Sequence, residues 1–260
     1  SLFKNEIGIL RASLVGSSQD QVRAINNDQP LVVRNFTYDI DAPKQDVTHY
    51  MAQIKAFRDF NNLGKLRLQY DFQRNQRFEF DLRRGADVDK ASLDLELDTH
   101  QLWLDLETRP VDELELKTGI TGKYQNNTAN PATGVRRLIP DFEKYELAAY
   151  GIGYYRLRED LLLEAGARFD YIFMDVFKFY RTSFWESRNY GELFSEIIVT
   201  TSGNQILTNP KPEFFNLSAT AGATYAIGDD YEIFFNYSLA SRAPNPSELF
   251  SEGLHHSASR

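Results

Sequence analysis

The residues best suited to chemistry are two adjacent histidines near the end of the chain, His255 and His256. Imidazole nitrogens bind haem iron, zinc and copper, so this pair is a candidate haem or metal site. Neighbouring residues of an extended segment point to opposite sides, so at most one would face a ligand unless the loop curls. Glu252 is a candidate further ligand. A pair held by hydrogen bonds to its own backbone or to the rest of the protein fits the same residues.

Two other places in the sequence could bind a ligand. Arg242 can hold a carboxylate or an anionic ligand through two parallel hydrogen bonds, and the alternative is a network within the wall of a sheet. The long segment 176–212 is rich in aromatic residues, among them Trp185 and Tyr190, and also carries arginines. Loops of this length are uncommon unless they are functional. These residues could grip a flat or sugar-like ligand, and a self-packed cap would use them equally well.

The sequence carries no common catalytic motif. A P-loop, a Gly-x-Ser-x-Gly and a His-Glu-x-x-His are all missing from its 260 residues. Gly151-Ile152-Gly153 lies inside an expected strand and lacks the third glycine and the following helix of a dinucleotide site. We therefore expect that the protein is not an enzyme. A hydrolase stays an alternative, because a catalytic triad needs only spatial proximity.

The elements that must position these residues are long strands. Apolar and polar residues alternate through most of the chain: Leu114, Leu116 and Ile120 share one face, for example, and Glu115 and Lys117 share the other. A helix would scatter such residues around its circumference, so the period of two predicts strands. The nine expected strands cover about 3–15, 46–60, 65–80, 91–106, 112–125, 142–157, 161–175, 213–226 and 231–242.

The connections between these strands alternate between short and long. Short turns at one end and long loops at the other are typical of a transmembrane β-barrel, whose strands need about 9–11 residues to cross the bilayer. The short joins are Asn61-Asn62-Leu63-Gly64, Thr108-Arg109-Pro110-Val111, Arg158-Glu159-Asp160 and Gly228-Asp229-Asp230. The long stretches are 17–45, 82–90, 126–141, 176–212 and 243–260.

Composition is consistent with such a barrel and excludes several other classes. A net charge of −8 argues against a nucleic-acid partner, and the absence of cysteine excludes disulfides and thiolate metal sites. The sequence contains no run of 18 apolar residues, so it predicts no transmembrane helix. In a membrane barrel, polar residues such as Asp94, Glu96, Asp98, Glu113 and Glu115 would line a wet lumen, and a solvated sheet face is the alternative. Aromatic residues expected to form an interfacial belt are Tyr124, Tyr154, Tyr155, Tyr171, Phe173, Tyr225 and Tyr231.

Three segments resemble signatures of the TonB-dependent outer-membrane receptors. Ser241-Arg242-Ala243-Pro244 is similar to a Phe-Arg-Ala-Pro box at a strand end, and Asn245-Pro246-Ser247-Glu248-Leu249-Phe250 continues it with Glu-Leu-aromatic. Gly253-Leu254-His255-His256 is similar to the Gly-x-His-His run of one large subgroup. Residues 74–84 and 163–170 resemble two recurrent strand segments. The resemblance covers most of 46–260.

The resemblance implies an all-β fold, an antiparallel transmembrane barrel of 22 strands in which this chain supplies about nine. It also implies the outer membrane of a Gram-negative bacterium, contact with outer-membrane lipid, and energised uptake through the TonB complex. Implied cargoes are an iron complex such as a ferric siderophore, haem or a divalent metal ion, with no intrinsic cofactor. In haem-receptor relatives a histidine follows the Arg-Ala-Pro box, which points to His255 and His256.

Two features of the family are not recognised in this sequence. We find no plug domain, through which the TonB complex would act, and no closing C-terminal strand, so residues 1–260 are expected to be part of a larger barrel. An odd number of strands supports that expectation, because bacterial single-chain barrels have even numbers. The alternative to a transporter is a structural or adhesive outer-membrane barrel without energised transport.

Overall fold

The computed structural model of the chain describes residues 43–61, 63–81, 89–135, 137 and 139–250, together with the single residues 22, 26 and 38. The expected strand over 3–15 and the residues Glu252, His255 and His256 lie outside the described residues. The chain divides into two compact units. One unit contains 77–94 and 130–135 along with residues up to Val47, and the other contains 48–76, 95–129 and 136 onwards.

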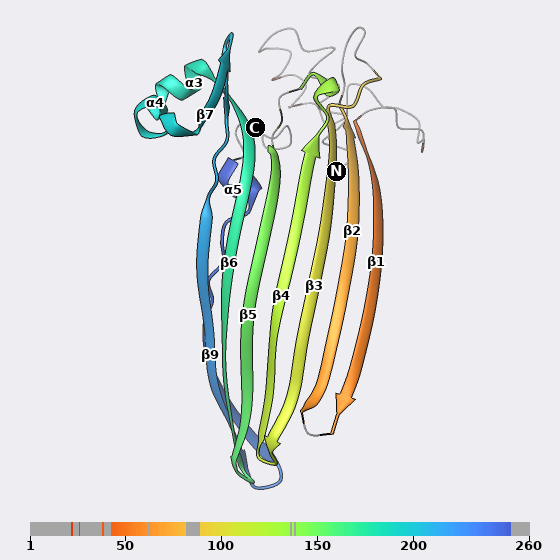
Figure 1. Cartoon of the computed structure of the whole chain (residues 1–260), viewed down its shortest axis with the longest axis vertical. Coiled ribbons are helices and arrows are strands. Elements are labelled where there is room, and N and C mark those ends of the chain that lie inside the picture. The colour runs from red at the N-terminus through yellow and green to blue at the C-terminus, as the bar shows by residue number, and fades with distance from the viewer. Residues whose placement is uncertain are drawn as a thin grey trace. The chain divides into compact units, whose positions relative to one another are not determined.

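Long strands make up most of the described chain (Figure 1). The strands are β1 (Lys44–Phe60), β2 (Gly64–Phe80), β3 (Leu93–Val111), β4 (Leu114–Ala129), β5 (Asp141–Arg158), β6 (Leu161–Arg181), β7 (Ile198–Ser202), β8 (Gln205–Thr208), β9 (Glu213–Ile227) and β10 (Tyr231–Leu239). The short helices are η2 (Pro131–Thr133), α3 (Thr182–Ser187), α4 (Tyr190–Leu193), η3 (Ser195–Ile197) and α5 (Pro246–Phe250).

The strands form one sheet of sequential hairpins. They pair in the order β1-β2-β3-β4-β5-β6, after which β6 pairs with β9 along its first half and with β8 near its end. β10 is the last strand of the series and pairs antiparallel with β9, and β7 pairs with β8. Eight strands lie where the alternation predicts them. The hairpin β7–β8 was not predicted, although its Gly203-Asn204 turn is a recognised hairpin signal.

The tight turns lie at one end of the strands in the second unit, and α3, α4 and β7 lie at the other (Figure 1). Gly64 opens β2 with a φ of 108°, and Gly228 begins the β9–β10 turn with a φ of 64°. Only glycine adopts such backbone angles readily. The predicted turn at Thr108–Val111 is displaced: β3 continues through Pro110 with an irregular register, and the turn is formed by Asp112 and Glu113. A bulge accommodates the missing N–H of Pro110.

The first unit is held together by polar contacts between neighbouring segments. Ser92 donates a backbone hydrogen bond of 2.7 Å to the carbonyl of Glu79. The backbone N–H of Asn130 donates to the carbonyl of Asp94 at 2.9 Å, and its side-chain amide donates to the Asp94 carboxylate at 2.8 Å. Asn130 also caps η2 by accepting from the N–H of Ala132. These contacts satisfy backbone groups where β2, β3 and β4 begin or end.

The sheet of the second unit has an apolar face, which we define by the side chains of Leu102, Ile120, Leu147, Phe169 and Leu217. Each of these side chains is about half exposed. The register places them on one face, because direct partners in adjacent strands share a side: Ile120 pairs with Ala149, which pairs with Phe169, which pairs with Leu217. Large apolar side chains that remain exposed over a whole face mark a surface that meets another apolar phase.

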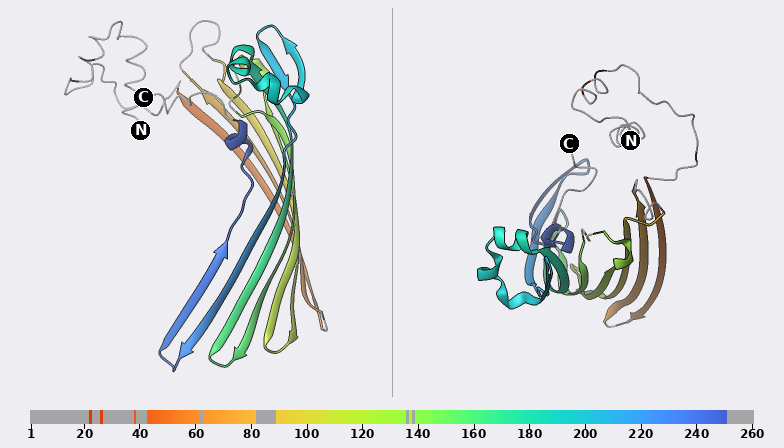
Figure 2. Two further views of the ribbon diagram at one scale, coloured as in Figure 1. Left: turned by 90° about the vertical axis from the view of Figure 1, so that its left-hand side faces the viewer. Right: turned by 90° about the horizontal axis from the view of Figure 1, so that it is seen from above.

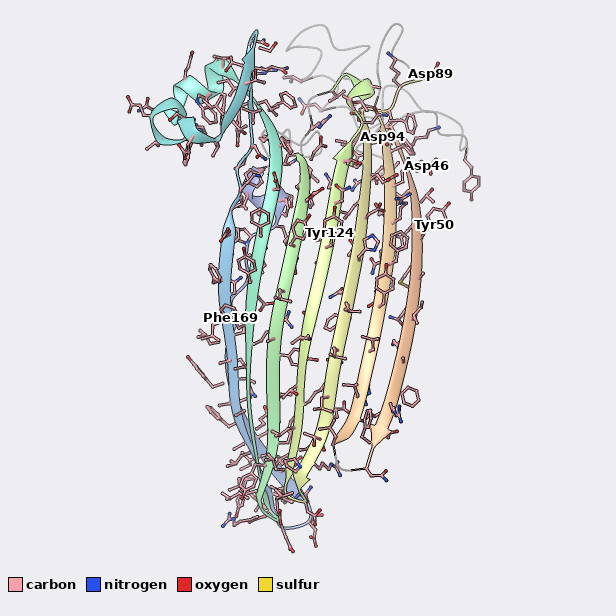
Figure 3. All side chains as sticks on the ribbon, in the orientation of Figure 1. Asp46, Tyr50, Asp89, Asp94, Tyr124 and Phe169 are labelled. Atoms are coloured by element: carbon pink, nitrogen blue, oxygen red, sulfur yellow. The ribbon has the colours of Figure 1, made fainter. Side chains whose placement is uncertain are left out.

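A row of rings crosses this apolar face near the long-loop end of the strands. His100, Tyr124, Tyr145 and Phe173 are successive register partners, with ring centroids 6.2, 5.0 and 6.1 Å apart. We call these four residues the aromatic row. Figure 3 labels Tyr124 of the row and Phe169, which lies nearer the tight turns on β6. The row corresponds to the interfacial belt predicted for Tyr124 and Phe173.

Further aromatic residues of the apolar face lie near the tight turns, including Tyr155 and Tyr225. Tyr145 and Tyr155 are ten residues apart on β5, about 33 Å along the strand, which becomes about 23 Å for a strand tilted by about 45°. Apolar bands of outer-membrane barrels are about 25 Å tall. Tyr154 was also expected in the belt, but it pairs with Glu115 and Glu164 and therefore lies on the opposite face.

The opposite, polar face carries the charged side chains of the strands. Lys123 and Lys144 both contact the Glu146 carboxylate, at 3.2 and 2.7 Å, and Arg168 pairs with Asp170 at 2.7 Å. Glu115 lies on this face as expected, whereas Glu113 belongs to a turn. Charged groups on one face and apolar groups on the other are the arrangement of a barrel with a wet interior.

Glu96 and Asp98 do not lie on the polar face, contrary to the sequence prediction. The alternation of β3 puts them on the same side as His100, beyond the aromatic row, where both contact Arg74. Leu97 points instead to the polar face and packs against a buried cluster there. The physical reason is that Leu97 packs against this apolar cluster, so the alternation of β3 turns Glu96 and Asp98 to the other face, where Arg74 balances their charges.

That buried cluster is the main apolar core of the second unit. It consists of Phe142, Ile172, Met174 and Val176, and Met174 and Val176 have no exposed surface. Phe250 of α5 packs against it. Figure 2 shows α5 lying over one face of the neighbouring strands. Across the described residues, no helix is long and apolar enough to cross a membrane.

Candidate functional site

The candidate site is built on the segment that follows β10, because this segment turns over the polar face of the sheet. Ser241 begins the turn: its N–H donates to the hydroxyl of Ser218 at 3.1 Å, and its own hydroxyl donates to the side-chain carbonyl of Asn216 at 3.1 Å. Asn216 and Ser218 are polar-face residues of β9. These bonds fix the direction in which the chain leaves the sheet.

The short helix α5 forms because its sequence carries good starting signals. Asn245 precedes Pro246, and the carbonyl of Asn245 accepts from the N–H groups of Glu248 and Leu249 at 2.9 and 3.1 Å. The Glu248 carboxylate reaches back and accepts from the N–H of Asn245 at 2.7 Å. A glutamate that returns to the start of its own helix in this way is one half of a capping box. Proline is well tolerated at the first helical position.

Arg242 and Glu248 close this segment with a two-pronged ion pair. The two guanidinium N–H groups donate to the two carboxylate oxygens at 2.8 and 2.7 Å. The Arg242 guanidinium and the Asn245 N–H together lower the pKa of Glu248 to about 2. The same carboxylate raises the pKa of Arg242. Arg242 was predicted to hold a carboxylate or to join a wall network, and its partner is a carboxylate of its own loop.

Two apolar residues seat the segment on the core. Ala243 and Phe250, at either end of the ion-paired turn, both pack against the cluster that contains Met174 and Val176. The polar contacts of Ser241 and the apolar contacts of Phe250 therefore hold 241–250 over the polar face. Arg242 was predicted as a site residue, whereas Glu248 and Phe250 were recognised only as part of a motif and not for these contacts. The capping signal Asn245-Pro246-Ser247-Glu248 could have identified the helix and hence the role of Glu248.

The long loop after β6 places its aromatic residues in one cluster. Trp185 is only 4% exposed, and its ring lies 5.3 Å from those of Tyr180 and Tyr190 in tilted and edge-on arrangements. The cluster also contains Phe184 and Phe194. The structure thus brings together the predicted residues Trp185 and Tyr190. Their packing resembles the self-packed cap, and a role in gripping a ligand stays a prediction.

The predicted metal site falls outside the part of the chain that can be inspected. His255, His256 and Glu252 follow Phe250 but are not among the described residues. Among the residues that are described, no three His, Asp or Glu side chains are grouped so that they could hold a metal ion. The remaining histidines, His49 and His100, lie on β1 and β3, and each has a polar side-chain neighbour, Asn75 and Tyr70 respectively.

The fold and the site together define an outer-membrane barrel, and comparison with known proteins identifies its family. Residues 11–259 match the family described as TonB dependent receptor-like, beta-barrel. The chain therefore belongs to the TonB-dependent receptors, which are outer-membrane proteins of Gram-negative bacteria. This family consists of transporters rather than enzymes. No curated protein matches the chain.

Solved structures with the same fold cover most of this chain. The ferric-catecholate import receptor Fiu from E. coli K12 is 18% identical, with a TM-score of 0.56 over 83% of this chain and 35% of that one. The copper transporter OprC is 16% identical, with a TM-score of 0.55 over 79% and 32%. The hemophore receptor HasR from Serratia marcescens is 14% identical, with a TM-score of 0.53 over 82% and 33%. The chain thus spans about a third of their length, and at these identities the likeness shows the fold.

Proposed function

We propose that this chain is part of the barrel of a receptor that takes up an iron complex, haem or a metal ion across the outer membrane with energy from the TonB complex. The observation that carries the proposal is the seating of 241–250 over the polar face. The loop that follows begins at Phe250, which is anchored in the core on that face. The candidate ligands Glu252, His255 and His256 belong to that loop.

The covalent chain limits how far the candidate ligands can lie from the anchor. His256 follows Phe250 by only six positions in the sequence. The proposal therefore assigns the histidine pair to the side of the long loops. Imidazole there suits haem iron, copper or zinc.

The named cargoes of structurally similar proteins support the same class of ligand. Fiu is a ferric-catecholate import receptor, OprC is a copper transporter, and HasR has been solved in complex with its hemophore and haem. All three cargoes contain a transition metal. The cargo proposed for this chain is therefore a metal ion or a small metal complex, and haem or copper would use His255 and His256 most directly.

The experiment measures binding to the intact receptor that contains this chain. His255 and His256 are both replaced by alanine, and haemin, Cu²⁺, Zn²⁺ and a ferric catecholate are titrated separately. We expect at least one ligand to bind tenfold or more weakly, equivalent to about 1.4 kcal/mol. His49→Ala is the matched control, because it removes a histidine from β1 and leaves the loop intact.

Two results would contradict the proposal. Unchanged affinity of the double variant for all four ligands would remove the histidine pair from the binding site. Equal uptake of the bound ligand by cells with and without TonB would refute energised transport, and would favour a barrel with a structural or adhesive role.

A further inference from the structure

The ion pair between Arg242 and Glu248 holds a carboxylate in a seat with three donors. The Glu248 carboxylate accepts from two guanidinium N–H groups at 2.8 and 2.7 Å, and from the backbone N–H of Asn245 at 2.7 Å. Two parallel bonds from a guanidinium are also the arrangement with which arginine recognises a carboxylate of another molecule. The seat is therefore shaped for a carboxylate, and the carboxylate that fills it belongs to the protein itself.

Both partners of this ion pair are open to solvent. The side chains of Arg242 and Glu248 are 68% and 44% exposed. In the Arg168–Asp170 pair of the strand wall, by contrast, the Asp170 side chain is only 19% exposed. An exposed ion pair gains little over the two separately hydrated groups. A carboxylate from solution can therefore replace Glu248 on the guanidinium with little loss of stability.

The backbone that carries Arg242 is held by contacts that do not involve Glu248. On one side, the N–H and the hydroxyl of Ser241 bond to polar side chains of β9. On the other side, Ala243 packs against the buried apolar cluster. We therefore expect Arg242 to keep its place when Glu248 leaves it, so that the guanidinium becomes available to another carboxylate.

The seat belongs to the polar face of the sheet, at the level of the aromatic row. Ala243 packs against the cluster that includes Ile172 and Met174, and these two residues flank Phe173 of the row on β6. Because Phe173 points to the apolar face, its two neighbours point to the polar face. The polar face lines the wet interior, which is the path of the cargo in the proposed function.

We propose that Arg242 binds a carboxylate group of the cargo, and that Glu248 occupies this position until the cargo displaces it. The inference rests on the proposed uptake of a metal complex, and it narrows the cargo to complexes with a free carboxylate, such as haem with its two propionates. Glu248 then acts as an internal competitor. Only the molecules in which Arg242 is unpaired can bind the cargo carboxylate, so the apparent affinity is reduced by that fraction.

The test titrates two ligands against the intact receptor that contains this chain: haemin, which has two carboxylates, and haemin dimethyl ester, which has none. Arg242→Gln should weaken haemin binding by about tenfold or more, because two charge-assisted bonds are lost, and should leave binding of the ester unchanged. Glu248→Gln should act in the opposite direction and tighten haemin binding about two- to fivefold. Its amide oxygen can still accept from the N–H of Asn245, so the start of α5 is kept.

The chain offers a matched control at the other end of the strands. Arg109 and Glu115 form an ion pair of 2.7 Å near the tight turns, with side chains 72% and 47% exposed. Glu115→Gln breaks this pair and should leave haemin affinity unchanged. If Arg242→Gln fails to fold, Arg242→Lys keeps the charge but loses the two-pronged geometry, and should weaken haemin binding severalfold. Ferric citrate, a carboxylate complex without a porphyrin, is titrated in parallel.

The opposite signs of the two substitutions decide the outcome. Weaker haemin binding in both Arg242→Gln and Glu248→Gln would show that the ion pair only supports the loop, and would overturn the competition. Unchanged binding in both variants, or no binding of haemin and ferric citrate by either the wild type or Glu248→Gln, would overturn the carboxylate seat. Failure of the proposed function is read separately, from the double variant of His255 and His256 and from the dependence of uptake on TonB.

Discussion

Replacing two neighbouring residues of β9 by arginine, one at a time, tests which face of the sheet meets lipid. Ala221 lies on the apolar face, six residues from Phe215 and four from Tyr225, which places it near the middle of the apolar band. Thr220 is its neighbour on the polar face, where its hydroxyl lies 3.0 Å from that of Ser238. An arginine on the lipid side near the bilayer midplane costs about 2–4 kcal/mol, a factor of about 30 to 1000 in the folding equilibrium.

We therefore expect Ala221→Arg to lower the free energy of unfolding by about 2–4 kcal/mol. Thr220→Arg should cost about 1–2 kcal/mol, because it loses the hydrogen bonds of the Thr220 hydroxyl to Asn236 and Ser238 but places its charge in a wet interior. The measurement is guanidinium-induced unfolding of the intact receptor in phosphatidylcholine vesicles, followed by tryptophan fluorescence. If the two substitutions cost the same, or if Thr220→Arg costs more, the assignment of the faces is wrong.

Two further predictions concern the core and the loop that it anchors. Met174→Ala should lower the free energy of unfolding by about 2–5 kcal/mol, since Met174 has no exposed surface, while Met51→Ala, at a side chain that is 68% exposed, should change it by about 0.5 kcal/mol or less. Equal effects of the two substitutions on the free energy of unfolding would contradict the burial of Met174 in the core. The second prediction is a pH dependence. Because folding lowers the pKa of Glu248 to about 2, its contribution is complete above pH 4.5 and is lost as the pH falls toward 2. Amide hydrogen exchange in α5, corrected for intrinsic rates, should show this loss of protection. Glu248→Gln should abolish the pH dependence of the protection. Wild-type protection that persists to pH 2 would contradict the role of the ion pair.

The strands were predictable because their signal is local. In β9 every second residue from Phe215 to Ile227 is apolar, and a strand needs no information from elsewhere to display that period. The hairpin β7–β8 was missed since its strands are only five and four residues long. The displaced turn after β3 shows the same limit, because the bulge at Pro110 depends on pairing with β4.

The faces and contacts of particular residues could not be predicted in the same way. Glu96 and Asp98 share a side with His100 by simple alternation, and only the pairing of β3 with β4 shows that this side belongs to the apolar face. Arg242 has many acidic residues in the sequence from which a partner could come. The turn of α5 selects Glu248, six residues away.

The class of this protein can be recognised from its sequence: the period of two, the short and long connections and the Arg-Ala-Pro segment identify a barrel strand pattern and its family. Only the three-dimensional arrangement shows on which face of the sheet Glu96 and Asp98 lie and where the segment after β10 is anchored. The physical reason is that alternation is encoded within one strand, whereas burial, ion pairing and open space depend on residues brought together from different strands.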